Sequence, residues 1–142
     1  MISITHIHPM LVHFPIALIM IGFIAECTSL YFKKETYWSL LGFYLLIVGT
    51  ATALLALLSG VLFTAEMSGT ANEVKETHEM FAWITLSILV AASSLHIYLK
   101  LRNPQNLTWK WLAFALFGLA AISVSITGFL GGTLVYNYMM PL

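Results

Sequence analysis

The stretch THIHPMLVHFPIAL at residues 5–18 places three histidines and two prolines where a strongly apolar segment begins. An imidazole beside lipid must be hydrogen-bonded, bound to a metal or in contact with water, because burying it bare is costly. A fourth histidine, His78, stands near the start of another apolar segment. Imidazoles gathered in this way are suited to ligate a haem iron or a metal ion.

The composition is that of a membrane protein. The 142 residues are 60% hydrophobic and 8% charged, whereas soluble domains carry about 25% charged residues. The formal net charge of zero gives no electrostatic footprint for nucleic acid. The single cysteine, Cys27, excludes a disulfide framework and a CxxC motif. The first segment lacks the features of a cleaved secretory signal, so we expect it to stay in the mature protein.

Four segments reach the roughly 20 apolar residues that a spanning helix needs. We expect these transmembrane helices at about 9–32, 37–64, 73–101 and 107–130. The connections between them are short, which favours antiparallel neighbours in an up-down bundle. The sequence therefore predicts an all-α fold, a four-helix bundle that forms one integral membrane domain over residues 1–142.

The basic residues predict the orientation of the bundle. Five of the six flank the first and third connections: Lys33, Lys34, Lys100, Arg102 and Lys110. The positive-inside rule places those connections in the cytoplasm and both termini on the periplasmic side. We therefore expect a multi-pass protein of a bacterial inner (plasma) membrane, with most of its histidines near the periplasmic face.

His13 and His78 are expected at the same depth on alternate helices. If Pro9 is the first helical residue and His8 its cap, His13 is the fifth residue of that helix. If Asn72 caps the third helix, His78 is its sixth residue, so each imidazole lies about one turn below the outer surface. One imidazole from each of two helices is the ligand set of a bis-histidine haem b. We expect His13 and His78 to hold that haem.

Small residues at the same level would make room for a porphyrin. Each of the two histidines has an alanine four residues further along its own helix face, and two glycines of the second and fourth helices fall at a similar depth. These candidate cofactor-lining residues are Ala17, Ala82, Gly60 and Gly128. Such small-residue seams are also the ordinary way in which membrane helices pack closely. Pro15 has no N–H to donate to the carbonyl of Leu11. A first helix that begins at Pro15 instead of Pro9 is therefore an alternative.

Copper is an alternative to haem. Several methionines fall near the same surface, namely Met10, Met67, Met80, Met139 and Met140. Soft thioethers combined with imidazoles suit Cu(I), and His8 is a further candidate metal ligand beside His13 and His78. A third interpretation is a non-catalytic helical subunit of a larger membrane complex.

The inner end of the bundle offers less chemistry. His96 has no partner histidine at its depth, so we expect a hydrogen-bonded structural role for it, and a solvated or snorkelling role for Glu26.

A short internal repeat is also present, because HFPIAL, which begins at His13, and HEMFAW, which begins at His78, carry alanine at the same place. This repeat indicates two related helical hairpins.

The motif HPMLVHFPIAL, a histidine opening the third span and GGTLVY after the fourth resemble the family called domain of unknown function 2231. This is a family of small bacterial four-helix membrane proteins without a settled activity, and the resemblance covers nearly the whole chain. The matching positions are His8, Pro9, His13, Pro15, His78, Gly131 and Gly132. Similar domains occur in chains that also carry Rieske or c-type cytochrome modules, so the resemblance implies electron transfer.

The sequence thus predicts a membrane b-type cytochrome-like protein, an electron carrier rather than an enzyme. No nucleophile constellation, paired catalytic carboxylates or phosphate loop stands out. The expected partners are the lipid bilayer, a quinol or a periplasmic redox protein, and a second copy of the chain in a homodimer. Nucleic acid is not among them.

Overall fold

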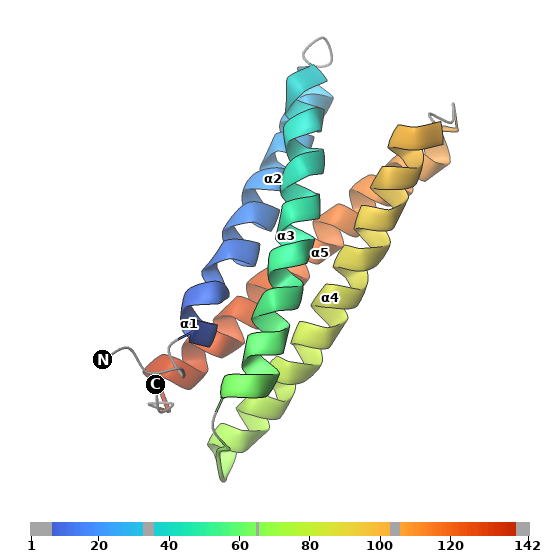
Figure 1. Ribbon diagram of the computed structural model, residues 1–142. Coiled ribbons are helices and arrows are strands. Elements are labelled where there is room, and N and C mark those ends of the chain that lie inside the picture. The colour runs from blue at the N-terminus through green and yellow to red at the C-terminus, as the bar shows by residue number, and fades with distance from the viewer. Residues whose placement is uncertain (1–6, 33–35, 65, 103–105, 139–142) are drawn as a thin grey trace.

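The fold is a bundle of long helices, seen in a computed structural model that describes residues 7–32, 36–64, 66–102 and 106–138. Its elements are α1 (Ile7–Leu11), α2 (His13–Tyr31), α3 (Thr36–Phe63), α4 (Thr70–Arg102) and α5 (Leu107–Tyr136) (Figure 1). Counting α1 and α2 as one segment, four helices are long and apolar enough to cross a membrane. The described residues contain no strand. The predicted all-α, four-span architecture is confirmed.

The first span begins at Ile7, and His8 lies inside it instead of capping it. Val12 separates α1 from α2, yet its φ of −62° and ψ of −23° are still right-handed helical. Its amide donates to the carbonyl of His8 at 3.1 Å, so the chain continues in nearly the same direction. The interruption has a local cause, because Pro15 has no N–H to donate to the carbonyl of Leu11.

Two other helices are longer than the sequence predicts. The third span begins at Thr70, directly after Gly69, whose φ of +63° is one that glycine adopts without strain. The fourth span begins after Asn106, whose side chain accepts a hydrogen bond from the amide of Thr108 at 2.8 Å. That span continues to Tyr136, beyond the expected end at residue 130.

The helices pack as two pairs. Helix α2 packs chiefly on α3, and α4 packs chiefly on α5, while fewer contacts join the pairs (Figure 1). The largest fully buried side chains come one from each span: Ile19, Leu46, Leu89 and Phe117. Glycine permits close approach within a pair, since a Cβ on Gly49 would lie 2.6 Å from Cδ1 of Ile19.

The two pairs repeat each other in sequence spacing. Leu89 follows Ile19 by 70 residues, and Phe117 follows Leu46 by 71. Three further pairs of buried small residues keep these two spacings: Gly22 with Ala92, Gly42 with Ala113, and Gly49 with Ala120. The structure thus supports two related hairpins, of which one comprises α1 to α3 and the other α4 and α5.

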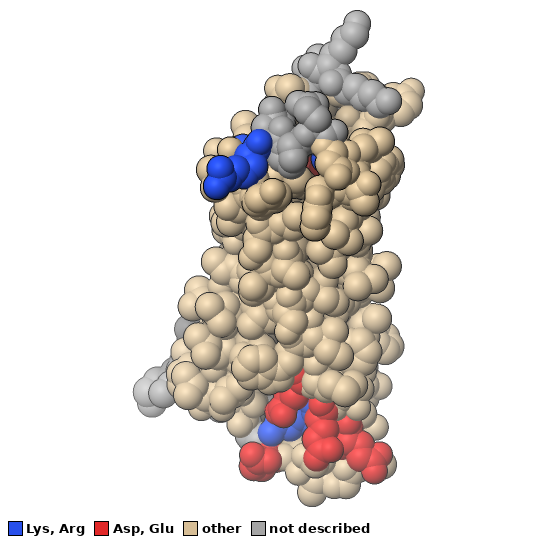
Figure 2. All heavy atoms as spheres, turned by 90° about the vertical axis from the view of Figure 1, so that its right-hand side faces the viewer, with Lys and Arg blue, Asp and Glu red and all other residues tan. Residues whose placement is uncertain are grey.

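Charged residues gather at the two ends of the bundle, with an uncharged belt between them on the face in Figure 2. One end, called the basic end here, carries Lys100, Arg102 and Lys110, and the opposite, acidic end carries Glu66, Glu73, Glu76 and Glu79 together with Lys75. Lys33 and Lys34 lie outside the described residues. The start of α1 and the end of α5 are both at the acidic end (Figure 1).

The core assignment predicts a difference between two phenylalanines of α5. Phe117 is fully buried, so Phe117→Ala leaves a cavity and should lower the free energy of unfolding by roughly 3 kcal/mol, at the lower end for such removals. Phe129 is 75% exposed, so Phe129→Ala should change it by less than about 0.5 kcal/mol. Unfolding by denaturing detergent measures both variants, and equal losses would contradict the assignment.

Candidate functional site

Two imidazoles face each other at the acidic end of the bundle. His8 projects from α1 and His78 from α4, with ring centroids 6.3 Å apart and ring planes at 77°. Both residues are half-buried and line a cavity of about 710 Å³. That volume lies within the range of roughly 300–1,000 Å³ typical of ligand sites. The arrangement is therefore a candidate binding site with two nitrogen ligands.

Each ring is held by its Nδ1 atom. His8 Nδ1 lies 3.0 Å from the carbonyl oxygen of Ala56 and 3.0 Å from the hydroxyl of Ser59 on α3. His78 Nδ1 lies 3.0 Å from the carbonyl oxygen of Thr127 on α5. A carbonyl only accepts, so Nδ1 carries the proton in both neutral rings and Nε2 carries the lone pair. No hydrogen bond to either Nε2 comes from the described residues, which leaves both nitrogens available to a ligand.

A glycine packs against each ring. A Cβ on Gly60 would lie 3.0 Å from Cε1 of His8, and a Cβ on Gly131 would lie 3.2 Å from Cε1 of His78. Contacts this short would push the imidazole away. Glycine at these two positions therefore lets each ring lie directly on the neighbouring helix.

The two halves of the site are equivalent in the internal repeat. His78 follows His8 by 70 residues, and Thr127, the acceptor for His78, follows Ala56 by 71. In each half the glycine that packs on the ring comes four residues after the acceptor, one helical turn along. The residue equivalent to His78 in the repeat is therefore His8. The alignment of HFPIAL with HEMFAW, which paired His13 with His78, used a different register.

His13 does not occupy the position that the sequence predicted for it. Its side chain is exposed, and its Nδ1 donates to the carbonyl of Pro9 at 2.6 Å. Five residues separate His8 from His13, which turns their side chains about 140° apart around a helix. His13 lines the same cavity as His8, but from an exposed position.

The predicted small residues divide into two groups. Ala82, Gly60 and Gly128 line the cavity. Gly128 makes room for an isoleucine rather than an imidazole, because its Cβ would lie 2.8 Å from Cδ1 of Ile16. Ala17 is exposed and is not part of the lining.

A cluster of hydroxyl groups beside His78 was not anticipated. Thr85 on α4 lies 2.6 Å from Ser123 and 2.9 Å from Thr127, measured between hydroxyl oxygens. This cluster joins α4, which carries His78, to α5, which binds its ring.

The sequence did contain a signal for the pair of His8 and His78. The motifs HPM at residues 8–10 and HEM at 78–80 share histidine and methionine at the same spacing.

The site offers two ligands rather than a closed metal cage. Within the described ranges no group of three or more His, Cys, Asp or Glu side chains is placed to hold a metal ion. Met10 and Met80 are exposed, while His6, Met139 and Met140 lie outside the described residues. A structural zinc site takes four protein ligands, whereas a haem takes axial ligands only.

The remaining interior polar residues lie toward the basic end. His96 donates from Nδ1 to the carbonyl of Ala92 at 2.9 Å and packs its ring on Phe117, in line with the expected structural role. Glu26 differs from the expected solvated role, because its Oε2 is buried without a hydrogen-bond partner among the described residues. It lies beside Gly42, where a Cβ would be 2.9 Å from that oxygen.

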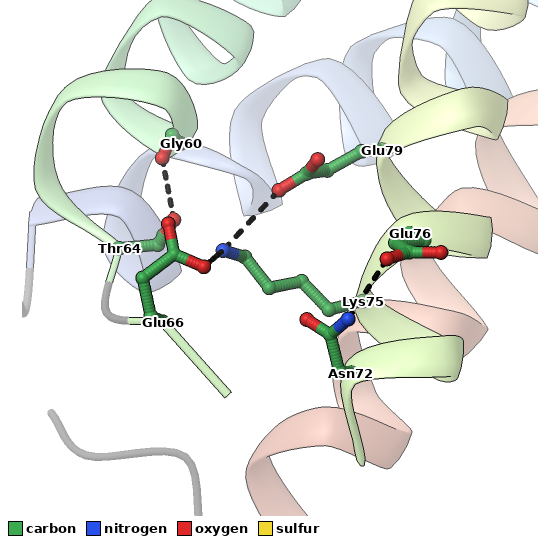
Figure 3. A network of polar contacts seen from close by, with 7 residues as sticks. All are labelled: Gly60, Thr64, Glu66, Asn72, Lys75, Glu76 and Glu79. Atoms are coloured by element: carbon green, nitrogen blue, oxygen red, sulfur yellow. Dashed lines mark hydrogen bonds and ion pairs between the residues drawn. The ribbon is translucent and has the colours of Figure 1, made fainter. Parts of the chain in front are cut away.

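A buried lysine stands on the wall of the same cavity as the two histidines. Lys75 is 8% exposed, and its ammonium nitrogen lies 3.6 Å from carboxylate oxygens of both Glu66 and Glu79 (Figure 3). The neighbouring Glu76 is engaged elsewhere, because it accepts from the side chain of Asn72 at 2.8 Å. The cavity is therefore bordered by two imidazoles on the inside and by one cation with its carboxylates toward the acidic end.

Comparison with known proteins gives one match. A family described as "Predicted membrane protein (DUF2231)" matches residues 5–141, a range that contains both facing histidines. No curated protein matches the chain, and no solved structure matches it.

The contact between Gly131 and His78 predicts an effect that the adjacent glycine should not share. Gly131→Ala adds a Cβ 3.2 Å from the His78 ring and should shift the ring resonances of that histidine in an NMR spectrum of protein labelled with ¹⁵N-histidine. Gly132→Ala meets nothing within 4 Å and should leave them in place. Equal shifts in the two variants would contradict the contact.

Proposed function

The chain belongs to DUF2231, a family of predicted membrane proteins, and we propose that it binds one b-type haem between His8 and His78 and carries electrons. The observation that carries this proposal is the facing pair of imidazoles. Each ring is fixed through Nδ1, and each has an Nε2 without a hydrogen bond from the described residues. A bis-histidine haem needs two such nitrogens.

The separation of the rings supports an atom bound between them. Their centroids are 6.3 Å apart. With both Nε2 atoms turned toward the midpoint, two metal–nitrogen bonds to histidine would take up roughly 4 Å of this distance. The remainder is about the contribution of the two rings between nitrogen and centroid. No large movement of either helix is then needed for coordination.

The hydrogen bonds on the far side of the rings support the same conclusion. Metal-ligating histidines almost always donate their other ring N–H to a carbonyl or carboxylate, which fixes the ring and raises its basicity as a ligand. His8 donates to Ala56 and His78 to Thr127. When bound, the haem would supply one-electron chemistry, and these residues would set its potential through burial and ligand hydrogen bonds.

The ligand pair differs from the pair that the sequence predicted. His13 is exposed and bonded to Pro9, so His8 takes its place opposite His78. Among the predicted lining residues, Gly60 lies against the His8 ring, and Ala82 and Gly128 border the same cavity.

The charge distribution supports an orientation for the site. Lys100, Arg102 and Lys110 gather at the basic end, which the positive-inside rule assigns to the cytoplasm. The two histidines then lie near the periplasmic face of a bacterial inner membrane. Electrons would pass there between a quinol, or a membrane dehydrogenase, and a separate periplasmic redox protein.

A single copper ion is the second candidate for this site. Imidazole suits copper as well as haem iron, and the 6.3 Å separation accommodates a lone ion equally well. Met10 and Met80, two of the five methionines that favoured copper in the sequence, are exposed, and they do not line the cavity. Haem is therefore the primary proposal.

The ligand assignment is tested by histidine substitutions in protein supplied with haem. His8→Ala and His78→Ala should each abolish the split, red-shifted absorption of the reduced bis-histidine haem. His13→Ala, the matched control, should leave it intact. His78→Met keeps an axial ligand and should retain haem while raising its reduction potential, since methionine–histidine ligation raises potentials.

Three results would contradict the proposal. An unchanged spectrum in both alanine variants would exclude His8 and His78 as ligands, and loss of the spectrum only in His13→Ala would restore the sequence-based pair. A colourless wild-type protein that contains copper, and loses it in the same variants, would identify a metal-ion site. A wild-type protein that takes up neither would favour a structural subunit of a larger complex.

A further inference from the structure

We infer that Lys75 binds the carboxylate groups of the molecule held in the cavity, which for the proposed haem are its two propionates. This inference rests on the proposed function, because it names how the same site recognises its ligand. It assigns a role to the buried cation that the histidine pair leaves unexplained.

Lys75 is placed on the ligand side of α4. It precedes His78 by three residues, so the two side chains share a helix face and Lys75 lies about 4.5 Å closer to the acidic end. Both residues line the same cavity. A ligand coordinated at His78 would therefore meet the lysine at its edge nearest the end of the bundle.

The Lys75 side chain is buried, but its ammonium group is weakly bound. Lysine is almost never found buried unless it is paired, and Lys75 is 8% exposed. Its two carboxylate neighbours stand at 3.6 Å, longer than the about 2.7–2.9 Å of a charge-assisted hydrogen bond. The part of the chain that the structure describes offers its three N–H groups no hydrogen bond. Lys75 thus has unused capacity to bind an anion.

The carboxylates of Glu66 and Glu79 would compete only weakly with a buried ligand carboxylate for the Lys75 ammonium group. The side chain of Glu66 is 94% exposed and that of Glu79 is 54% exposed. Ion pairs of exposed carboxylates contribute little, because water screens them. A ligand carboxylate inside the cavity would meet the ammonium group where the effective dielectric constant is lower, and the attraction there is stronger.

Charge balance makes the lysine necessary for an anionic ligand. Glu66, Glu76 and Glu79 line the same cavity, and their charges would repel a carboxylate. Among the described residues Lys75 is the one Lys or Arg at the acidic end, since Lys100, Arg102 and Lys110 lie at the other. Without Lys75 the cavity would accept an uncharged ligand more readily than an anionic one.

The test compares haem with its dimethyl ester, which lacks the propionate charges, in detergent-solubilised full-length protein. Lys75→Met should weaken haem binding roughly ten- to hundred-fold, the range of a hydrogen bond to a charged group, and leave ester binding unchanged. Lys100→Met is the matched control, because it removes a lysine stacked on Phe43 at the basic end and should affect neither ligand. Titration followed by absorption measures all six affinities, those of the wild type and the two variants for each ligand.

The outcomes separate this inference from the proposed function. If the wild-type protein binds neither haem nor the ester, the proposed function fails. If haem binds with a bis-histidine spectrum but Lys75→Met binds it as tightly as wild type, the haem site stands and the lysine assignment is wrong. Unchanged ester binding also shows that the variant is folded. Should Lys75→Met not fold, Lys75→Arg must keep the wild-type preference for haem over the ester, and its loss there would overturn the inference.

Discussion

The hydrogen bond from a histidine Nδ1 to a carbonyl of the neighbouring helix is the constraint on which the site depends. A helical carbonyl already accepts one backbone bond, so a second donor must approach its remaining lone pair from the side. Gly60 and Gly131, each one turn beyond the acceptor, allow that approach by leaving space for the ring. The bond then fixes the tautomer and leaves Nε2 for a ligand. Both rings depend on the same three elements: a histidine, a carbonyl and a glycine.

The internal repeat explains why the two rings lie at one level. Equivalent positions in two similar hairpins come to the same depth when the hairpins pack side by side in the same direction, as α2 with α3 and α4 with α5 do (Figure 1). The repeat has diverged at one interior position toward the basic end. His96 follows Glu26 by 70 residues and so occupies the equivalent position, yet one is a carboxylate with a buried oxygen and the other an imidazole bonded to its own helix. The repeat has thus kept the same side chain at the facing histidines and has changed it at Glu26 and His96.

The spans were predictable from the sequence, but the pair of histidines that face each other was not. Long apolar segments and short connections are sufficient for four antiparallel helices, and the structure has them. Which residue of the first span lies opposite His78 depends on the rotation of the helix about its axis. An error of five residues turns a side chain by about 140°. Pro15 left the helix start open, so the sequence argument took His13 where the structure has His8. The structure brings two histidines together near one end of the bundle, with His8 rather than His13 opposite His78. The sequence did not single out Lys75, whose contacts reach Glu66 before α4 as well as Glu79 on its own helix.

A layer of buried apolar side chains lies beneath the histidines. Ile19 follows His8 by 11 residues and Leu89 follows His78 by 11, which places both about 16 Å deeper along their helices. With Leu46 and Phe117 they are the largest fully buried side chains, and they stand between the cavity and the interior polar residues of the basic end. These four side chains offer no hydrogen-bond partners to water. The cavity lies on the acidic-end side of this layer, where Glu66, Lys75, Glu76 and Glu79 are part of its lining.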